Sequence, residues 1–278
     1  MAPGGETLVG PRCGVSPEDR ARLAGRLAEA YVTREPIDPP SGIAALSVED
    51  AYAVQLLQVD QRVASGARVR GHKVGLTSRA MQEMFGVDQP DYGCLLDTMF
   101  VAPGERVAAS DFLQVRVEPE VAFVLGRDLC GPGVTVADAM RAIDAVIAAL
   151  ELIDSRIRDW QLTLVDTIAD NASSGAVVLG SRPVLASQVD VRLIGCNFYR
   201  NGTLMETGAG GAVLGSPITA LVWLANTLGA LGVTLEAGEV VLSGSCTKAV
   251  PGRHGDTVLA HFAELGSVSV TFDEEGSA

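Results

Sequence analysis

The chain has 278 residues, of which 47% are hydrophobic and 20% are charged, a balance typical of a globular protein with a sizeable buried core. Its formal net charge of -13 argues against nucleic acid and anionic membranes as partners, because both bind basic surfaces. The five cysteines are widely spaced and the N-terminus lacks the apolar core of a signal peptide, so we expect a cytoplasmic protein with reduced thiols and no membrane span.

The N-terminal part of the chain has the patterns of two helices. Residues 1–15 are rich in Gly and Pro, which predicts a flexible terminus. Ser16 followed by Pro17 is a typical helix start. Ser47 and Asp50 have the spacing of a capping box at the start of a second helix. Residues 16–65 are therefore expected to form a helical segment.

From residue 66 onward, short β-branched runs and frequent glycines replace the helical periodicity. The runs predict strands at 69–76, 115–125, 176–179, 191–198, 240–243, 258–262 and 268–272. Asn201-Gly202 is a hairpin signal, and helices are expected near Thr135 and from Ser216 to about Leu231. Because strands and helices do not alternate regularly, we predict an α+β fold. Its core would be a β-rich roll or sandwich over residues 66–278, and a doubly wound sheet is not expected.

One predicted strand places two carboxylates on the same face. Alternate side chains of a strand share a face, so Glu118 and Glu120 point the same way, roughly 6–7 Å apart. Two such charges repel unless a positive group lies between them, and Mg²⁺ or Mn²⁺ would suit an all-oxygen site. The alternative is a solvated polar face on which Arg116 supplies the counter-charge.

A third carboxylate, Glu151, lies in the apolar run 147–153, which is expected to be buried. A lone buried carboxylate is costly unless it is paired or bound to a metal ion. The alternative is a glutamate at the end of a helix, facing solvent. Three carboxylates would complete a metal site that leaves coordination positions open to substrate and water.

Six motifs occur in order along the chain. They are Gly71-His72-Lys73-Val74-Gly75 with the residues up to 78, Asp88-Gln89-Pro90-Asp91-Tyr92-Gly93, Val117-Glu118-Pro119-Glu120-Val121, the stretches 149–157 and 166–175, and Gly244-Ser245-Cys246-Thr247. Together they resemble the 2-keto-4-pentenoate hydratase family, with 2-oxohept-3-enedioate hydratase and 4-oxalocrotonate decarboxylase as relatives in the fumarylacetoacetase-like superfamily. The resemblance extends over nearly the whole chain from about residue 45.

The resemblance implies a role for each candidate site residue. Glu118, Glu120 and Glu151 would hold a Mg²⁺ or Mn²⁺ ion, and Lys73 and Asp91 would be catalytic polar residues. From the residues alone, Lys73 could instead be a surface lysine and Asp91 a turn residue after a proline. Ser245 and Thr247 are candidates for binding the substrate carboxylate.

The resemblance also implies an activity and an assembly. The expected enzyme is a hydro-lyase of aromatic-compound catabolism, a homo-oligomer whose substrate is a small 2-oxo acid. It would add water to 2-hydroxypenta-2,4-dienoate or a close homologue and form a 4-hydroxy-2-oxo acid. The family fold is a fumarylacetoacetase-type β-rich core, here the catalytic domain, behind a helical N-terminal segment.

Three other functions remain open from the sequence. A 4-oxalocrotonate-type decarboxylase would use the same metal ligands, although Asp159-Trp160 and Val165-Asp166-Thr167 favour the hydratase. An acylpyruvate hydrolase would need a histidine paired with an acid near the metal, and no such pair is evident. His72 is expected to be structural. A catalytically inactive oligomer partner is disfavoured because none of the carboxylates is missing, nor is Lys73.

Overall fold

The computed structural model describes residues 14–273, so most of the segment 1–15, predicted to be flexible, lies outside the described residues. The α-helices are α1 (Pro17–Thr33), α2 (Val48–Ala64), α3 (Arg79–Phe85), α4 (Val136–Ala142), α5 (Leu164–Ala169) and α6 (Pro217–Ala230). The strands are β1 (Val69–Gly75), β2 (Asp91–Leu96), β3 (Phe100–Val101), β4 (Arg106–Ala108), β5 (Arg116–Leu125), β6 (Ile143–Ile153), β7 (Ser174–Leu179), β8 (Gly195–Arg200), β9 (Thr203–Ala209), β10 (Val240–Ser245), β11 (Val250–Pro251), β12 (Thr257–Phe262) and β13 (Gly266–Asp273).

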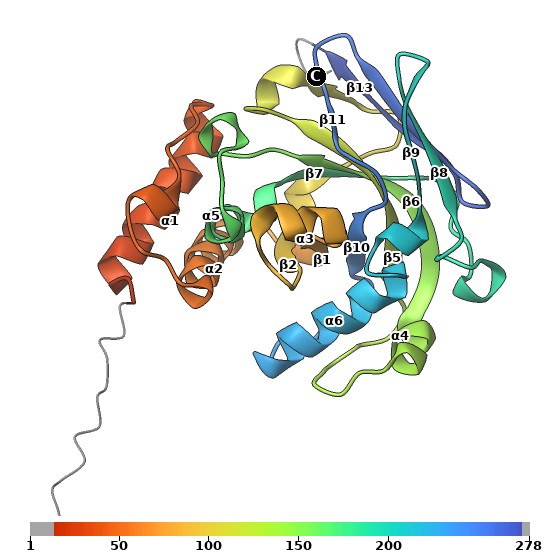
Figure 1. The fold of residues 1–278 in the computed structure, drawn as a ribbon, viewed down its shortest axis with the longest axis horizontal. Coiled ribbons are helices and arrows are strands. Elements are labelled where there is room, and N and C mark those ends of the chain that lie inside the picture. Colours follow the sequence, from red (N-terminus) through yellow and green to blue (C-terminus); the bar gives the residue numbers. More distant parts are fainter. Residues whose placement is uncertain (1–13, 274–278) are drawn as a thin grey trace, which may run out of the picture.

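Both N-terminal helices begin where their caps predict. The Ser16 hydroxyl accepts a hydrogen bond from the Asp19 amide (3.1 Å), and Ser47 forms a capping box with Asp50. The two helices pack against each other and against α5, on the opposite side of the molecule from β8 and β9 (Figure 1). Leu23, Leu27 and Val54 are fully buried at this contact. The apolar stripes of the helices therefore attach the N-terminal segment to α5.

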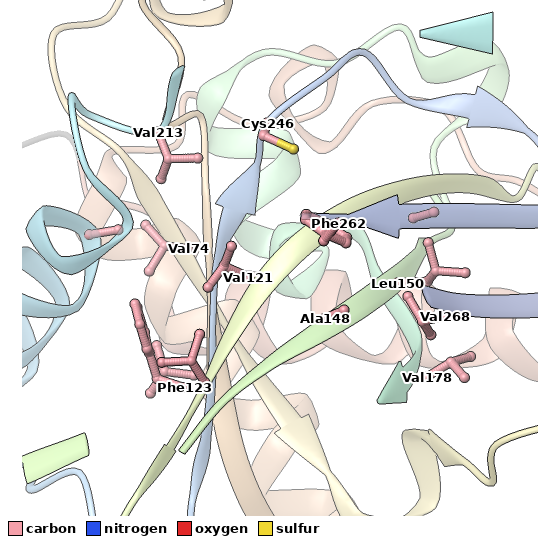
Figure 2. Packing of buried hydrophobic residues seen from close by; sticks show 14 of the residues in the cluster. Val74, Val121, Phe123, Ala148, Leu150, Val178, Val213, Cys246, Phe262 and Val268 are labelled. Carbon is pink, nitrogen blue, oxygen red and sulfur yellow. The ribbon is translucent and has the colours of Figure 1, made fainter. Parts of the chain in front are cut away.

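A curled eight-stranded sheet forms the centre of the molecule. Its strand order is β2-β1-β10-β5-β6-β7-β3, with β11 paired to β5. A five-stranded sheet, β4-β13-β12-β8-β9, packs against it, and Figure 2 shows Phe262 and Val268 of this second sheet beside Ala148 and Leu150 of β6. This arrangement confirms the predicted α+β fold with a β-rich core and N-terminal helices.

The two faces of β5 and β6 pack into different clusters. Val121, Phe123 and Leu150 belong to the main core, which includes residues of both sheets (Figure 2). Ala122 and Ala149 belong to a smaller cluster on the other face. Because side chains alternate along a strand, Glu118, Glu120 and Glu151 share this second face.

Several predicted boundaries were wrong. The strand expected at 191–198 is β8 at Gly195–Arg200, because residues 191–193 form a turn. The helix expected near Thr135 is confirmed as α4, with Thr135 as its N-cap, but the chain then passes directly into β6, which was not predicted. Glu151 therefore lies within a long strand, and its alternative placement at an exposed helix end is excluded. The short elements α3, α5 and β2 were not predicted, because their sequences lack a periodic pattern of apolar residues.

Other predicted elements agree with the structure. Asn201 and Gly202 form the turn between β8 and β9, both with positive φ. The helix expected from Ser216 is α6, which packs on α4 and β10. No helix within residues 14–273 is both long enough and apolar enough to cross a membrane.

Candidate metal centre and active site

The pairing of β5 with β6 brings the three predicted carboxylates together. Glu118 lies directly opposite Glu151 in the register, and Glu120 lies two residues further along β5. One oxygen of each side chain lies within 4.8 Å of the others. Glu120 and Glu151 are buried, and Glu118 is half-buried. Two strands that are distant in sequence thus build one compact group of acids.

The three carboxylates are in an environment that disfavours their charged forms. Burial raises the pKa of Glu118 to about 7, with a further contribution from Glu151, and burial also raises the pKa of Glu120. Burial raises the pKa of Glu151 although the neighbouring Lys73 ammonium opposes the shift. Neither oxygen of Glu151 has a hydrogen-bond partner among residues 14–273. Such groups require a cation or a proton to be stable in this position.

A divalent metal ion fits this donor set. All candidate ligand atoms are carboxylate oxygens, which hard cations such as Mg²⁺ prefer. Two of these oxygens, both on Glu151, are buried without a hydrogen bond from any residue of the described range 14–273. One oxygen of Glu120 is already held by the Gly244 amide at 2.7 Å, which orients this side chain. The residues present therefore match the chemistry of a metal site.

Lys73 is a buried residue of β1 beside the carboxylates, not a surface lysine. Its Nζ lies 3.3 Å from Oε1 of Glu151 and donates a hydrogen bond to the carbonyl of Ala172 at 2.9 Å. Burial lowers the pKa of Lys73, but the carboxylates of Glu151 and Asp91 outweigh it, so the pKa lies above its ordinary value. The side chain therefore stays a cation in the metal-free protein.

Asp91 is the first residue of β2 and is buried next to Lys73. Its cross-strand partner is Gly75, and a Cβ at that position would collide with the Asp91 carboxylate and lie 3.5 Å from Nζ of Lys73. The Oδ1 atom of Asp91 has no hydrogen-bond partner among the described residues. Burial raises the pKa of Asp91 despite the opposing effect of Lys73. The alternative of an exposed turn residue is therefore excluded.

The hydroxyls of Ser245 and Thr247 contact backbone carbonyls of β5 and of the loop after β10. Ser245 Oγ donates to the carbonyls of Pro119 (3.3 Å) and Thr247 (3.0 Å), and Thr247 Oγ1 donates to the carbonyl of Lys248 (3.0 Å). The group of this loop that reaches the carboxylate cluster is the Gly244 amide. Ser245 and Thr247 thus shape the loop after β10, next to Glu120.

Comparison with known proteins agrees with this geometry. The C-terminal domain of fumarylacetoacetate (FAA) hydrolase matches residues 63–273. The 2-keto-4-pentenoate hydratase of Paraburkholderia xenovorans (strain LB400) is 42% identical over 260 residues, which cover 93% of this chain and 97% of that protein. The chain belongs to the 2-keto-4-pentenoate hydratase family. The resemblance inferred from the six motifs is thereby confirmed, and so is the expected class of enzyme at the level of the family.

Two further proteins, a second hydratase and a decarboxylase, are also similar to this chain. The 2-oxo-hept-4-ene-1,7-dioate hydratase of Escherichia coli is 43% identical over 257 residues, which cover 90% of this chain and 96% of that protein. The structure of 4-oxalocrotonate decarboxylase from Pseudomonas putida G7, complexed with magnesium and adipate, superposes with a TM-score of 0.90 at 35% identity. It covers 93% of this chain and 98% of the decarboxylase chain. Hydratases and a decarboxylase therefore share the fold of this chain.

Other polar residues of the family motifs serve the scaffold around the site. Asp166 caps α5 through the amide of Thr163 (2.8 Å) and binds Ser41. Asp170 pairs with the fully buried Arg156. His72 is buried on the face of β1 opposite Lys73, with its Nδ1 3.7 Å from Glu239, and burial lowers the pKa of His72 to about 4. Within residues 14–273, the three-carboxylate cluster includes no histidine.

Sequence reasoning missed the backbone groups of the site. The Gly244 amide holds Glu120 and the Ala172 carbonyl holds Lys73, yet neither group depends on a side chain that a motif could show. In the sequence, the glycine of the motif Gly244-Ser245-Cys246-Thr247 was the signal that could have pointed to the Gly244 amide. Gly244 has a φ of 109°, a conformation that favours glycine, and a Cβ there would collide with Thr77.

Proposed function

We propose that this chain is a divalent-metal-dependent hydratase that adds water to 2-hydroxypenta-2,4-dienoate or a close homologue and forms a 4-hydroxy-2-oxo acid. The main observation in support is the buried cluster of Glu118, Glu120 and Glu151 with Lys73 Nζ 3.3 Å from Glu151. The hydratases among its relatives are 42–47% identical over most of the chain, which supports the same reaction.

Glu118, Glu120 and Glu151 would hold the metal ion, for which Mg²⁺ or Mn²⁺ suits the oxygen donors. The ion would act as a Lewis acid toward the carboxylate and the 2-oxygen of the substrate. The magnesium bound in the decarboxylase complex supports this choice. The ligands account for binding of a 2-oxo acid but not for the transfer of its protons.

Proton transfer would fall to Lys73 and Asp91. An ammonium has three donors; in Lys73 one is used by Ala172 and one faces Glu151, which leaves one for a substrate oxygen. Oδ1 of Asp91 has no hydrogen-bond partner among the described residues, and burial raises the pKa of Asp91, which favours its protonated form. In hydration the enol hydroxyl at the second carbon loses its proton as the fifth carbon gains one, and water then supplies the hydroxyl at the fourth carbon and the proton at the third.

A cleft that includes Thr77 would receive the tail of the substrate, because Thr77 lies against Gly244, whose amide donates to Glu120. It lies between α3 and residues 211–215 and is lined by Thr77, Arg79, Glu83 and Asp88. Arg79 already pairs with Glu83 at 2.8 Å, and Asp88 adds a second negative charge. This charge balance favours a short tail without a second carboxylate.

The same proposal includes the setting of the enzyme. We place it in the cytoplasm, in aromatic-compound catabolism, as a homo-oligomer with residues 66–278 as the catalytic domain and residues 16–65 as a helical segment. Gln55 and Gln58 of α2 donate to the carbonyls of Ile168 and Ala169, so this segment supports the chain that leads to the site.

Product analysis separates hydration from the reaction of the decarboxylase relative. Purified protein with Mg²⁺ is mixed with 2-hydroxypenta-2,4-dienoate or with a 2-oxo diacid, and products are followed by proton NMR. The expected result is a 4-hydroxy-2-oxo acid from the dienoate. Release of carbon dioxide from the diacid without hydration of the dienoate would assign the chain to the decarboxylase branch.

A further inference from the structure

The chain between α5 and β7 contains a turn of the left-handed kind. Asn171, Ala172 and Ser173 have φ values of 53°, 50° and 54°, so three consecutive non-glycine residues adopt the left-handed conformation. L-residues disfavour this region because Cβ approaches the following carbonyl oxygen. Such a conformation persists only where surrounding contacts hold it.

The side chain of Asn171 fastens this turn to strand β2. Its Oδ1 accepts a hydrogen bond from the amide of Cys94 (2.8 Å), and its Nδ2 donates to the carbonyl of the same residue (2.9 Å). The Asn171 side chain therefore makes the two backbone hydrogen bonds with Cys94 that a residue of a neighbouring strand would make. Ser174 Oγ, at 2.8 Å, donates to the carbonyl of Asn171 and closes the turn.

Gly93 leaves room for the turn beside Lys73. It is the cross-strand partner of Lys73, and a Cβ on Gly93 would lie 2.6 Å from the carbonyl oxygen of Asn171. The backbone of the turn thus occupies the space that a side chain opposite Lys73 would otherwise fill. As a result, the Ala172 carbonyl accepts a hydrogen bond from Lys73 Nζ at 2.9 Å.

We propose that Asn171 is a positioning residue that acts through Lys73. By holding the left-handed turn on β2, it aims the Ala172 carbonyl at Nζ and keeps the ammonium beside Glu151. The role assigned to Lys73 rests on the proposed function. The position of the ammonium does not, because it follows from the hydrogen bonds of Asn171 and Ala172.

Asn201 offers a matched control. It is also an asparagine with left-handed φ, 50°, and both ends of its amide are bonded: Nδ2 to Asp256 at 2.7 Å and Oδ1 to the amide of Thr257 at 2.8 Å. It lies in the exposed β8–β9 hairpin. Asn171→Ala and Asn201→Ala therefore lose the same chemical groups in the same conformation.

Kinetics give the first readout. With Mg²⁺ and the dienoate, Asn171→Ala is expected to lower kcat about tenfold to a hundredfold with KM changed less than about threefold, because a displaced group slows the reaction step itself. Asn171→Gly, which adopts the left-handed conformation freely, is expected to lose the same turnover. Asn201→Ala is expected to keep the wild-type kcat. Wild-type kcat in folded Asn171→Ala and Asn171→Gly would overturn the proposal.

Chemical labelling gives a second readout that does not depend on turnover. The sequence has two lysines, buried Lys73 and exposed Lys248, which serves as an internal standard. Acetylation by an amine reagent, measured by peptide mass spectrometry, is expected to be faster at Lys73 in Asn171→Ala than in Asn201→Ala, relative to Lys248. Equal rates would contradict the positioning role. Absence of hydration by the wild type would refute the proposed function, and the labelling would still decide the role of Asn171.

Discussion

At the scale of single residues, Lys73 and Glu151 form a buried ion pair at the centre of the site. Their side chains are 5% and 0% exposed, so solvent contributes almost nothing to their charges. A buried pair of this kind is poor evidence for stability, because desolvation offsets most of the attraction. Its position beside two more carboxylates is instead what a binding site for a metal ion and an anionic substrate requires.

Replacing Lys73 tests its role in proton transfer. Lys73→Ala is expected to keep metal binding but to lower kcat by at least about a hundredfold, the usual contribution of a positioned acid or base. Lys73→Arg is expected to restore substrate binding better than rate, because a guanidinium does not release its proton near neutral pH. Steady-state kinetics at saturating Mg²⁺ measure both effects. Near-normal turnover of Lys73→Ala would leave proton transfer to Asp91.

Replacing Glu118 tests the metal site. Glu118→Gln removes one of the three proposed ligands and is expected to weaken Mg²⁺ binding at least about tenfold. The fold is expected to remain intact, because the neutral amide relieves repulsion from Glu120 and Glu151 in the metal-free protein. Calorimetric titration with Mg²⁺ measures the binding affinity, and thermal unfolding shows whether the fold is intact. Unchanged metal affinity would exclude Glu118 as a ligand.

At the scale of elements, the β1–β2 pair carries Lys73 and Asp91, the proposed catalytic side chains, and its glycines make room for the groups around them. Gly75 lies opposite Asp91 and Gly93 lies opposite Lys73. A Cβ on Gly75 would collide with the Asp91 carboxylate, and a Cβ on Gly93 would collide with the carbonyl of Asn171 in the turn beside Lys73. The short helix α3, which follows β1, has no buried residue and forms one wall of the cleft.

The space at Gly75 can be tested with a single methyl group. Gly75→Ala is expected to displace the Asp91 carboxylate and to lower kcat about tenfold or more, with a stability loss of about 1–3 kcal/mol from overpacking. Gly25→Ala in α1, where no atom lies within 4 Å of the added Cβ, is the control. It is expected to raise stability by about 0.5–1 kcal/mol without affecting turnover. Full activity of Gly75→Ala would show that the Asp91 position is not critical.

The cleft next to α3 predicts a preference for substrates with one carboxylate. Glu83→Gln frees Arg79 and removes a negative charge, so kcat/KM for a seven-carbon dicarboxylate is expected to rise about two- to fivefold relative to the five-carbon substrate. Glu35→Gln, an exposed acid of the loop after α1, is the control for net charge. Comparison of the two substrates at low salt provides the measurement. An unchanged ratio would place the tail elsewhere.

At the scale of the whole molecule, the chain is acidic although its proposed substrate is an anion. The net charge is -13, and only two lysines occur in the chain. Lys73 is a buried cation paired with Glu151, and the metal ion would add further positive charge to the site. The activity of the enzyme should follow the occupancy of the carboxylate cluster.

Chelation and pH test this dependence. Removal of divalent ions is expected to abolish turnover, and Mg²⁺ or Mn²⁺ to restore it. The pKa of Glu118 is raised from 4.5 to about 7, so protons compete with the metal below pH 7 and apparent Mg²⁺ affinity is expected to fall there. Titration calorimetry at pH 6 and pH 8 measures the change. Full activity of the metal-free protein would contradict the proposed mechanism.

The raised pKa of Glu118 also determines how the stability of the metal-free protein depends on pH. Between pH 4.5 and about 7 the folded state holds a proton on Glu118 that the unfolded state has lost. Folded stability is therefore greatest at the low end of this window and falls as pH rises through it. In Glu118→Gln this part of the pH dependence is expected to disappear from thermal unfolding curves. An unchanged slope would mean that other groups determine it.

The sequence by itself determined the elements whose signals are local. Ser16 and Ser47 cap helices, Asn201-Gly202 turns a hairpin, and alternation along β5 placed Glu118 and Glu120 on one face. The ordered motifs were sufficient to identify the family. In each of these cases a few neighbouring residues contain the whole physical reason.

Only the tertiary structure decided how distant groups meet. The register of β5 with β6 brings Glu151 to Glu118, and the left-handed turn brings the Ala172 carbonyl to Lys73. Strand β6 was not recognised because its run of buried apolar residues also fits a helix. Register and backbone groups depend on packing between strands, which no local pattern specifies. The sequence therefore supplies the side chains of the site, and the curled sheet determines their distances.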